Sequence, residues 1–488
     1  MMKGDSKIWS LAALVVMCSV WLLSARRLTL SQVETESSKV QLLKAFKGQH
    51  ANTRKFAIQI NPSVKVKTIE KVRAAQYGAN NKNTRTTTTA ALTKKTTDET
   101  VAFCISVTDC QWSMRDAAAV HGHAIDTVQI KSSRYRHVRY AFVHPTAQAC
   151  VNDLQRLGYQ VLVRDLPFNI SDIQSKLFQS KIEENGCCGS MEYMKLWSYS
   201  LFKHTMAIHL DTDTILLQPL DDLWDAMLNP MRSNKIQVEP SSLYQPNKSQ
   251  SIDFMFTRGY LQGSTFLPPN TTNRHEITTK WGVQGGFFVV RPSRRIFQEI
   301  VDTILAGKFT FLKGWNRQGY GGYWGAAQIQ GLLSYIYRPS SNSMTGAVEL
   351  NRCIYNNMHD PMYFPTGRHK GQCTTLETSC TNDCRETPIE KIKLAHFTLC
   401  RKPWNCDDYD DGVGLCSQVL QLWFETRLSL EQSWNVSIES VDESLWFYNA
   451  SLGYCRKLAR NSKKQNQTGQ MYKAHKGSYQ RMIFPWDR

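Results

Sequence analysis

Apolar and polar positions follow a β-α-β pattern from residue 101 onward. Residues 101–107 and 137–143 are apolar runs of the kind that forms buried strands. Between residues 147 and 157 apolar residues recur at helical spacing, and Gly158 then favours the end of a helix. Residues 160–163 have the pattern of a short strand. This order predicts an α/β fold with a mostly parallel sheet.

A pair of carboxylates follows the next predicted strand. Residues 190–202 have a helical pattern, and the apolar strand 206–210 comes after them and ends at Asp211. Ligands of open α/β sheets bind beyond the carboxyl ends of the strands, where Asp211 and Asp213 are expected. Residues two apart in extended backbone project to the same side, so both carboxylates can converge on one hard cation. The ordinary alternative is a pair of turn-capping residues.

The N-terminus carries an uncharged apolar run, residues 8–24, with basic residues on both sides. With about 17 residues it is short for a membrane-spanning helix and long for the apolar part of a cleaved signal peptide. We expect residues 1–27 to form a cytoplasmic tail and a retained signal-anchor of a single-pass type II protein; a cleaved signal peptide is the alternative. Either interpretation places the rest of the chain in the lumen of the Golgi or the endoplasmic reticulum.

Cysteines and glycosylation signals also favour the lumen. The chain has 14 Cys, bunched from Cys353 onward, which indicates disulfides; a zinc site at Cys380 and Cys384 is the alternative within the Cys-rich stretch 353–416. If Cys18 lies in the membrane, an odd number remains. At least one thiol is then free or paired between chains, so a disulfide-linked or non-covalent dimer stays open. Six Asn-x-Ser/Thr sequons occur, at Asn169, Asn247, Asn270, Asn435, Asn449 and Asn466.

Composition assigns the remaining segments. The chain is 42% apolar and 20% charged, values that exclude wholesale disorder and collagen-like fibres. Lys and Arg exceed Asp and Glu by 59 to 41. Residues 28–100 are basic and Thr-rich, and we interpret them as a stem or a disordered linker. The basic tail, 456–488, is expected to be a solvated surface, or to attract an acidic acceptor or anionic lipid head groups. No nucleic-acid partner is expected.

Four ordered blocks carry a more specific signal. They are Lys195-Leu196-Trp197 with residues 210–223 around Asp211 and Asp213, the strand 284–293, the turn Gln330-Gly331-Leu332-Leu333, and His396-Phe397 with Lys402-Pro403-Trp404. Together these blocks resemble glycosyltransferase family 8, the glycogenin-like retaining enzymes, in a secretory-pathway type II membrane form. The resemblance covers most of residues 101–404, and it implies a GT-A fold over residues 101–455, a Rossmann-like sheet flanked by helices.

The resemblance also implies a UDP-sugar donor and Mn²⁺. Cleavage of a sugar–diphosphate bond leaves negative charge on the departing phosphate, which needs preorganised positive charge. Asp211, Asp213 and His396 would hold Mn²⁺, since this cation accepts carboxylate and imidazole ligands. Lys402 would contact the β-phosphate. Lys195 would hold the donor phosphate or sugar, and Asp213 and Lys195 would both act in catalysis.

Other donor contacts are expected around these groups. Thr108 and Trp112 follow the first strand; Trp112 would stack on uracil or belong to the core. Gln284 and Gly285 would lie near the sugar hydroxyls. Gln330 would face the anomeric carbon opposite the leaving phosphate, or make a structural hydrogen bond at a helix start.

The sequence departs from the family at three positions. Ile329 stands where the family usually has Asp, so a carboxylate nucleophile is absent there, while Gln284 replaces an Asn and Leu399 a Gly. We expect a retaining transferase that moves a hexose or hexuronic acid to a glycan, glycolipid or protein acceptor. A catalytically silent lumenal sugar-binding or scaffolding protein on the same fold is the alternative, and a metal-dependent hydrolase is a third reading.

Overall fold

The computed structural model describes residues 99–487, apart from these gaps: 185–186, 241, 243, 248, 260–281, 312, 322, 339–345, 365–369, 375–379, 381, 407–413, 437–451 and 457–476. The predicted membrane segment, residues 8–24, and almost all of the predicted stem lie outside the described residues. None of the described helices combines the length and apolar character needed to cross a bilayer.

A seven-stranded sheet in the order β10-β6-β7-β4-β1-β2-β3 forms the centre of the fold. Its strands are β1 (Thr100–Val107), β2 (Arg136–Val143), β3 (Gln160–Val163), β4 (Met206–Leu210), β6 (Phe254–Arg258), β7 (Val283–Val290) and β10 (Ala347–Glu349). Strand β1 pairs in parallel with β2 and β4, as do β2 with β3 and β6 with β10. Only β7 is antiparallel to its neighbours in this sheet. The predicted mostly parallel sheet is therefore confirmed.

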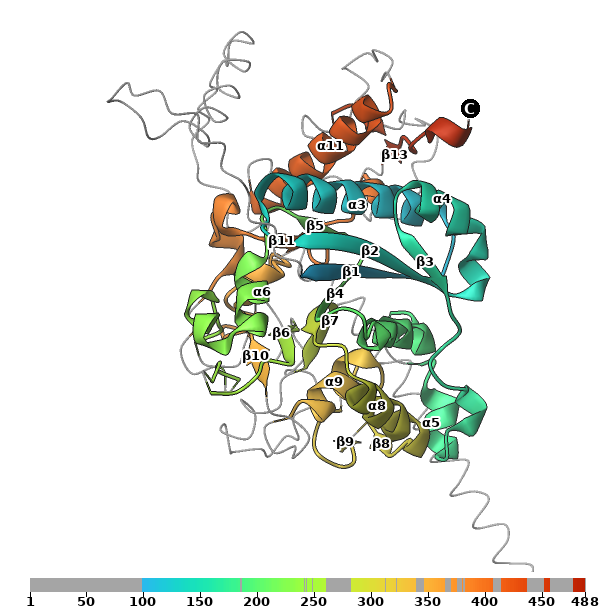
Figure 1. Cartoon of the computed structure of the whole chain (residues 1–488), viewed down its shortest axis with the longest axis vertical. Helices are drawn as coiled ribbons and strands as arrows, with labels where there is room; N and C mark the ends of the chain where they lie inside the picture. The colour runs from blue at the N-terminus through green and yellow to red at the C-terminus, as the bar shows by residue number, and fades with distance from the viewer. Residues whose placement is uncertain are drawn as a thin grey trace, which may run out of the picture. The chain divides into compact units, whose positions relative to one another are not determined.

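Helices cover both faces of the sheet, with α3 and α4 over one face and α8 and α9 against the other (Figure 1). The helices are α3 (Trp112–Ser132), α4 (Val151–Arg156), α5 (Lys176–Lys181), α6 (Asp221–Leu228), α8 (Arg294–Ala306), α9 (Ile329–Ile336), α10 (Arg352–Tyr355) and α11 (Leu415–Ser433). In β1, Val101 and Phe103 pack toward α3 and α6, whereas Ala102 and Cys104 pack toward the cluster that contains α8 and α9. Burial on both faces explains why this strand is continuously apolar.

Two predicted helices differ in detail from the structure. Residues 147–157 divide into a 3₁₀ segment, Pro145–Cys150, and α4, and the junction lies at Cys150, which a disulfide ties to Cys110. The segment predicted as a helix over 190–202 is a 3₁₀ helix, Gly189–Ser200. Side chains three residues apart eclipse one another in a 3₁₀ helix. This alignment places the buried polar residues Glu192, Lys195 and Ser198 in one row.

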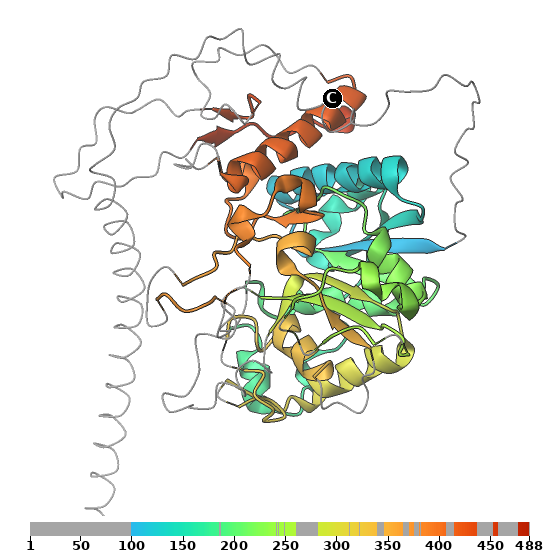
Figure 2. The same ribbon diagram turned by 90° about the vertical axis from the view of Figure 1, so that its left-hand side faces the viewer.

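Short strand pairs and α11 complete the fold. The pairs are β5 (Thr214–Leu216) with β11 (Leu394–His396), β8 (Phe309–Thr310) with β9 (Gly314–Trp315), and β12 (Cys455–Arg456) with β13 (Ser478–Tyr479). Helix α11, coloured orange-red, lies along α3 in both views (Figures 1 and 2). Residues 477–487 were expected to belong to a solvated basic tail, but Met482 and Phe484 are buried against α3 and α11. Aromatic and apolar residues in this segment outweigh its basic composition.

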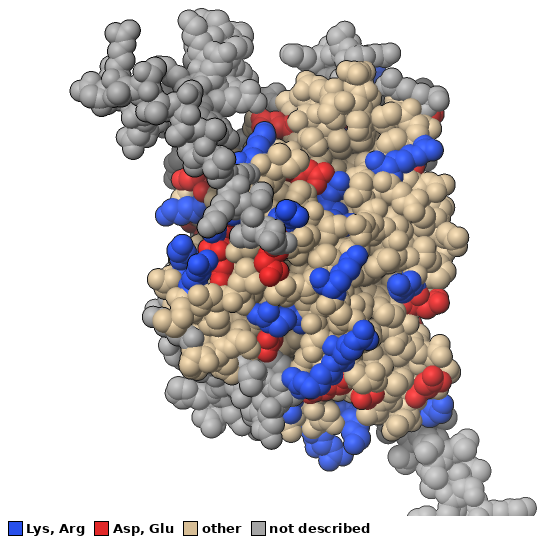
Figure 3. Space-filling model, in the orientation of Figure 1, with Lys and Arg blue, Asp and Glu red and all other residues tan. Residues whose placement is uncertain are grey.

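Five disulfides join ten of the described cysteines. They are Cys110–Cys150, Cys353–Cys384, Cys373–Cys380, Cys400–Cys416 and Cys406–Cys455. The disulfide interpretation of the Cys-rich stretch therefore fits the structure. Cys380 and Cys384, the candidate zinc ligands, are bonded to different partners. On the face drawn in Figure 3, Lys and Arg side chains are interspersed with Asp and Glu rather than gathered in one basic stripe.

Replacing Phe484 should test whether the C-terminal segment is part of the core. Its ring is 1% exposed and packs against Trp434 and Trp486, at centroid distances of 5.6 and 5.2 Å. Phe484→Ala should therefore lower the free energy of unfolding by about 3–5 kcal/mol. The adjacent Ile483 is 51% exposed, so Ile483→Ala should change it by less than about 0.5 kcal/mol. Guanidinium unfolding measures both, and equal small effects would assign the segment to the solvated surface.

Candidate metal centre

Strand pairing brings the two Asp residues and the distant His together. Asp211 follows β4 directly, and Asp213 precedes β5, whose Thr214 pairs with His396 of β11. The backbone N–H of Phe397 donates to the carbonyl oxygen of Asp213 at 2.9 Å and extends this pairing. The potential ligand atoms of Asp211, Asp213 and His396 all lie within 4.8 Å of one another. The three residues that the sequence placed in one metal centre are thus adjacent.

Asn356 fixes the orientation of the His396 ring. Its Oδ1 is 3.1 Å from His396 Nδ1, while its Nδ2 donates to Thr257 Oγ1 at 3.0 Å and to Gln284 Oε1 at 3.2 Å. Because the amide nitrogen is used elsewhere, Oδ1 accepts from a protonated Nδ1. Nε2 then directs its lone pair toward the carboxylates, 3.3 Å from Asp213 Oδ1. Burial lowers the pKa of His396 to about 4, so the imidazole is neutral at pH 7.

Gly286 on β7 leaves the space that a ligand needs beside these side chains. A Cβ atom at this position would lie 2.5 Å from Asp211 Oδ2 and 2.6 Å from His396 Cε1. The carbonyl oxygen of Gly286 also accepts the backbone N–H of Asp211 at 2.9 Å. Two carboxylates and one neutral imidazole form a ligand set that suits Mn²⁺. The residues present therefore fit the implied metal.

Lys195 contacts three protein acceptors. Its Nζ lies 2.8 Å from Glu192 Oε2, 2.9 Å from Asp211 Oδ1 and 3.1 Å from the carbonyl oxygen of Gly285. An ammonium group has three donors, so these contacts use all of them. Burial alone would lower the pKa of Lys195, but Asp211 and Glu192 raise it, and the group stays charged. The geometry thus favours a positioning role over the predicted direct contact with the donor.

Asp211 responds to the same cluster. Burial opposes its ionisation, but Lys195 and then His396 outweigh that effect and lower its pKa to about 2. The carboxylate is therefore negatively charged at neutral pH.

Lys402 is placed differently from Lys195. It forms an ion pair with Asp213, and its side chain is 34% exposed. Burial lowers its pKa to about 8. The disulfide Cys400–Cys416 ties the loop that carries Lys402 to α11. Lys402 is thus a partly accessible cation at the edge of the metal centre, as the expected contact with a β-phosphate requires.

Gln330 lies next to Gly285 on the side of β7 away from Gly286. A Cβ atom on Gly285 would lie 3.0 Å from Gln330 Cγ, and one on Gly325 would lie 2.0 Å from Gln330 Oε1. Gln330 Oε1 is buried without a hydrogen-bond partner among the described residues. The Oε1 of Gln284 accepts from the backbone N–H of Gly286 at 2.6 Å and from Asn356 Nδ2 at 3.2 Å. That oxygen is therefore hydrogen-bonded within the protein, and the contact of Gln284 with a sugar hydroxyl stays a prediction.

Thr108 and Trp112 lie at the carboxyl end of β1, beside β4. The carbonyl oxygen of Thr108 accepts from Thr146 Oγ1 at 2.9 Å. Trp112 begins α3 and stacks on Tyr479, with 5.3 Å between ring centroids and 26° between ring planes, while the Arg481 guanidinium lies 4.8 Å from its centroid. These contacts favour the structural reading of Trp112 over stacking on uracil.

Asn356 and Glu192 were not among the residues predicted from the sequence. Asn356 follows α10 in the Cys-rich stretch, and no local pattern separates it from neighbouring Asn residues. Glu192 is three residues before Lys195, a spacing that could have suggested an ion pair.

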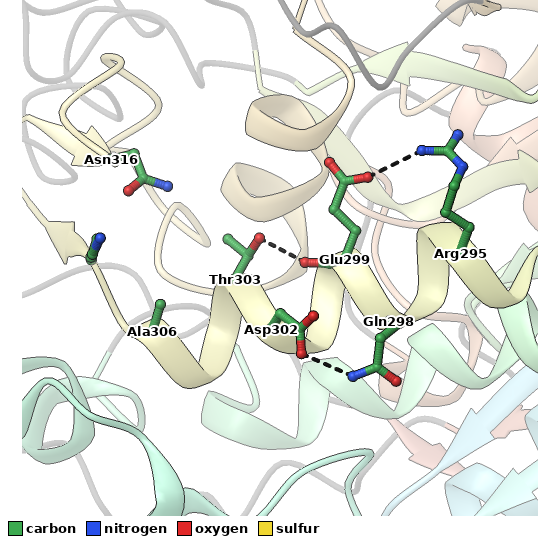
Figure 4. A pocket seen from close by; sticks show the side chains of 8 residues that line it. Arg295, Gln298, Glu299, Asp302, Thr303, Ala306 and Asn316 are labelled. Carbon is green, nitrogen blue, oxygen red and sulfur yellow. Dashed lines mark hydrogen bonds and ion pairs between the residues drawn. The ribbon is translucent and has the colours of Figure 1, made fainter.

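A groove along α8, shown in Figure 4, contains none of these residues. Four of its polar side chains form two pairs: Arg295 Nη1 is 3.5 Å from Glu299 Oε2, and Gln298 Nε2 donates to Asp302 Oδ1 at 2.9 Å. The groove therefore offers no clustered groups comparable to the metal centre.

No protein-family model matches the sequence, and no curated protein matches it. Among solved structures, the chain is similar to mouse xyloside xylosyltransferase 1, with 12% identity and a TM-score of 0.38 over 62% of this chain and 99% of that one. It is similar to the galactosyltransferase LgtC, with 12% identity and a TM-score of 0.35 over 70% of this chain and 98% of that one. It is also similar to the S. cerevisiae mannosyltransferase Ktr4p, with 8% identity and a TM-score of 0.29 over 60% of this chain and 81% of that one.

Replacing Asn356 should weaken metal binding without removing a metal ligand. Asn356→Ala takes away the acceptor that holds His396 Nδ1–H, so Mn²⁺ affinity should fall by about tenfold to a hundredfold. Asn152→Ala, at an exposed position of α4, should leave the affinity unchanged. Calorimetric titration of Mn²⁺ into both variants and the wild type gives the comparison. Unchanged affinity in Asn356→Ala would show that His396 is oriented by other contacts.

Proposed function

We propose that this protein is an Mn²⁺-dependent retaining glycosyltransferase that moves a hexose or hexuronic acid from a UDP-sugar to a glycan, glycolipid or protein acceptor. One observation carries the proposal: two carboxylates, a neutral imidazole and a partly exposed ammonium group meet at the carboxyl end of β4. These groups complement a cation and a diphosphate together. A water-activating hydrolase has less need of Lys402.

One group of residues would bind the diphosphate end of the donor, and another would lie at its sugar. Bound by Asp211, Asp213 and His396, Mn²⁺ would supply positive charge that stabilises the departing diphosphate. Lys402 adds a fixed positive charge beside Asp213. Lys195 keeps Asp211 ionised and in place through their contact at 2.9 Å. The phosphate end of the donor is thus held by opposite charges that are arranged before it binds.

Gln330 is the group that we place at the reacting carbon. Its buried Oε1 has no hydrogen-bond partner in the described part of the chain, so its lone pairs can face positive charge that develops at the anomeric carbon. The neighbouring Ile329 offers no carboxylate and is buried at 0% exposure. Retention at this site therefore has to proceed without a carboxylate nucleophile from position 329.

The transfer proposal is tested by removing one charge from the metal centre. Asp213→Asn keeps the side-chain shape but removes the negative charge, so Mn²⁺-dependent binding of UDP should fall at least about a hundredfold and transfer should be lost. Calorimetry with UDP and Mn²⁺ measures binding, and release of UDP from UDP-glucose, UDP-galactose and UDP-glucuronic acid measures turnover. Asp302→Asn, in the groove along α8, is the matched control and should change neither quantity.

Variants of the two lysines test their different roles in the same assay: Lys402 in binding phosphate and Lys195 in positioning Asp211. Lys402→Ala removes a charge-assisted contact of about 1.5–3 kcal/mol and should weaken UDP binding tenfold to a hundredfold while the fold is kept. Lys195→Ala should also lower thermal stability, because it leaves Glu192 and Asp211 without their buried cation. Binding of UDP without turnover of any donor would instead support the sugar-binding or scaffolding protein. Full transfer in a chelator would contradict the metal mechanism.

We further propose a Golgi or endoplasmic-reticulum location with the folded part in the lumen. The five disulfides support it, and the described sequon residues Asn169, Asn247 and Asn435 are all exposed, as glycan attachment requires. Protease added to intact microsomes should leave the part after residue 27 undigested, and detergent should expose it. Digestion without detergent would place that part in the cytosol.

A further inference from the structure

Two adjacent cysteines, Cys187 and Cys188, lie beside the metal centre as thiols. Their Sγ atoms are 2.8 Å apart, and both residues are exposed. Cys187 Sγ lies 2.7 Å from Glu192 Oε1 and donates to it. The second oxygen of that carboxylate holds Lys195, which in turn holds Asp211. One line of contacts therefore runs from the thiol pair to a proposed metal ligand.

Counting cysteines singles out this pair. Of the 13 cysteines in the described part of the chain, ten form disulfides. The other three are Cys104, Cys187 and Cys188. Cys104 is 0% exposed in β1, and burial raises the pKa of its thiol, so it is inert toward thiol–disulfide exchange. A bond between Cys187 and Cys188 would leave no exposed thiol among the described residues and would account for the odd number.

We propose that Cys187 and Cys188 form a reversible vicinal disulfide that adjusts the donor site to the redox state of its surroundings. The oxidant is a low-molecular-weight disulfide such as oxidised glutathione. One Cys thiolate attacks it, forms a mixed disulfide and releases one glutathione thiol; the second Cys sulfur then displaces the other glutathione thiol and closes the ring. One disulfide and two Cys thiols thus become one Cys187–Cys188 disulfide and two glutathione thiols, and the electrons balance.

The two thiols differ in a way that suits this exchange. Their mutual hydrogen bond is the main cause that raises the pKa of Cys187 and lowers that of Cys188. Cys188 therefore supplies the thiolate that starts the reaction, since the thiolate is the nucleophile. Cys187 keeps its single proton, shared between Glu192 Oε1 at 2.7 Å and the Sγ of Cys188 at 2.8 Å, until the ring closes.

Adjacency makes the bond reversible. Neighbouring Cα atoms lie about 3.8 Å apart across a trans peptide, below the roughly 4.4–6.8 Å that disulfides usually span. A ring between neighbours is therefore strained, and strained, exposed disulfides are the labile ones. The five other disulfides join residues at least 7 positions apart, with Cα separations of 4.7 to 5.5 Å. The vicinal bond should thus be reduced under conditions that leave those five intact.

The effect on the donor site, unlike the disulfide itself, rests on the proposed function. In the dithiol state Cys187 shares a proton with Glu192, which moderates the pull of this carboxylate on Lys195. Ring closure removes that proton, so Glu192 attracts Lys195 more strongly and away from Asp211. Mn²⁺-dependent UDP affinity should therefore be several-fold lower in the disulfide state.

Peptide mapping of the full chain tests the bond directly. After equilibration in glutathione buffers of different reduced-to-oxidised ratios, the chain is alkylated in denaturant and digested with trypsin. Cleavage after Lys181 and Lys195 releases a peptide that contains Cys187 and Cys188 and no other cysteine. We expect two alkyl groups on this peptide in reducing buffer, none in oxidising buffer, and recovery on return. Alkylation of both cysteines at every ratio, or mixed disulfides with glutathione alone, would overturn the proposal.

Calorimetry of UDP with Mn²⁺ in the same buffers tests the coupling. The double variant Cys187→Ser, Cys188→Ser is the matched control, because its hydroxyl at position 187 can still donate to Glu192 and neither position can form a disulfide with its neighbour or with glutathione. Wild-type affinity should change several-fold between buffers, while that of the double variant should stay at the reduced value. Equal wild-type affinity in both states would overturn the coupling. If UDP bound in neither state, the proposed function would fail, and the peptide map would still decide the disulfide.

Discussion

A single buried ammonium group organises the site. Lys195 meets Glu192, Asp211 and the carbonyl oxygen of Gly285, and with three donors it has none left over. A buried charge is costly unless it is paired and hydrogen-bonded, so these three acceptors cannot move independently of it. The 3₁₀ helix, the end of β4 and strand β7 are therefore tied to one point. The metal centre on one side and Gln330 on the other are both built outward from that point.

Strand β7 separates Gln330 from the candidate metal ligands by the width of one strand. Successive residues of a strand point to opposite faces, and the pair Gly285 and Gly286 leaves both faces open at the same height. Gln330 fills the space beside Gly285, while Asp211 and His396 line the space beside Gly286. A larger side chain at either position would collide with one half of the site. Two glycines in sequence thus let Gln330 and the candidate metal ligands lie on opposite sides of one backbone segment.

The sequence predicted the parts of the site that are encoded locally. Strand β4 followed by Asp211 is a short-range pattern, and the structure has the strand at Met206–Leu210. His396 and Lys402, which belong to one short block, both lie beside Asp213. Asn356 could not be predicted in this way, because its role depends on contacts with residues that the fold brings together. Residues 477–487 were misjudged for a related reason. Their basic composition predicted exposure to solvent. Met482 and Phe484 are buried because α3 and α11 pack against them, and this packing cannot be seen in the local sequence.

The antiparallel pair β5–β11 brings His396 to the two Asp residues of the candidate metal centre. It joins Thr214 to His396 across a long stretch of chain, and closing such a loop is entropically costly. Two features hold the β11 side in place: the disulfide Cys400–Cys416 ties the following loop to α11, and the backbone of Phe397 continues the pairing to Asp213. The disulfide-rich C-terminal part thus contributes to the candidate site as well as to the stability of the fold. It holds the loop that carries Lys402 next to the strand that carries His396.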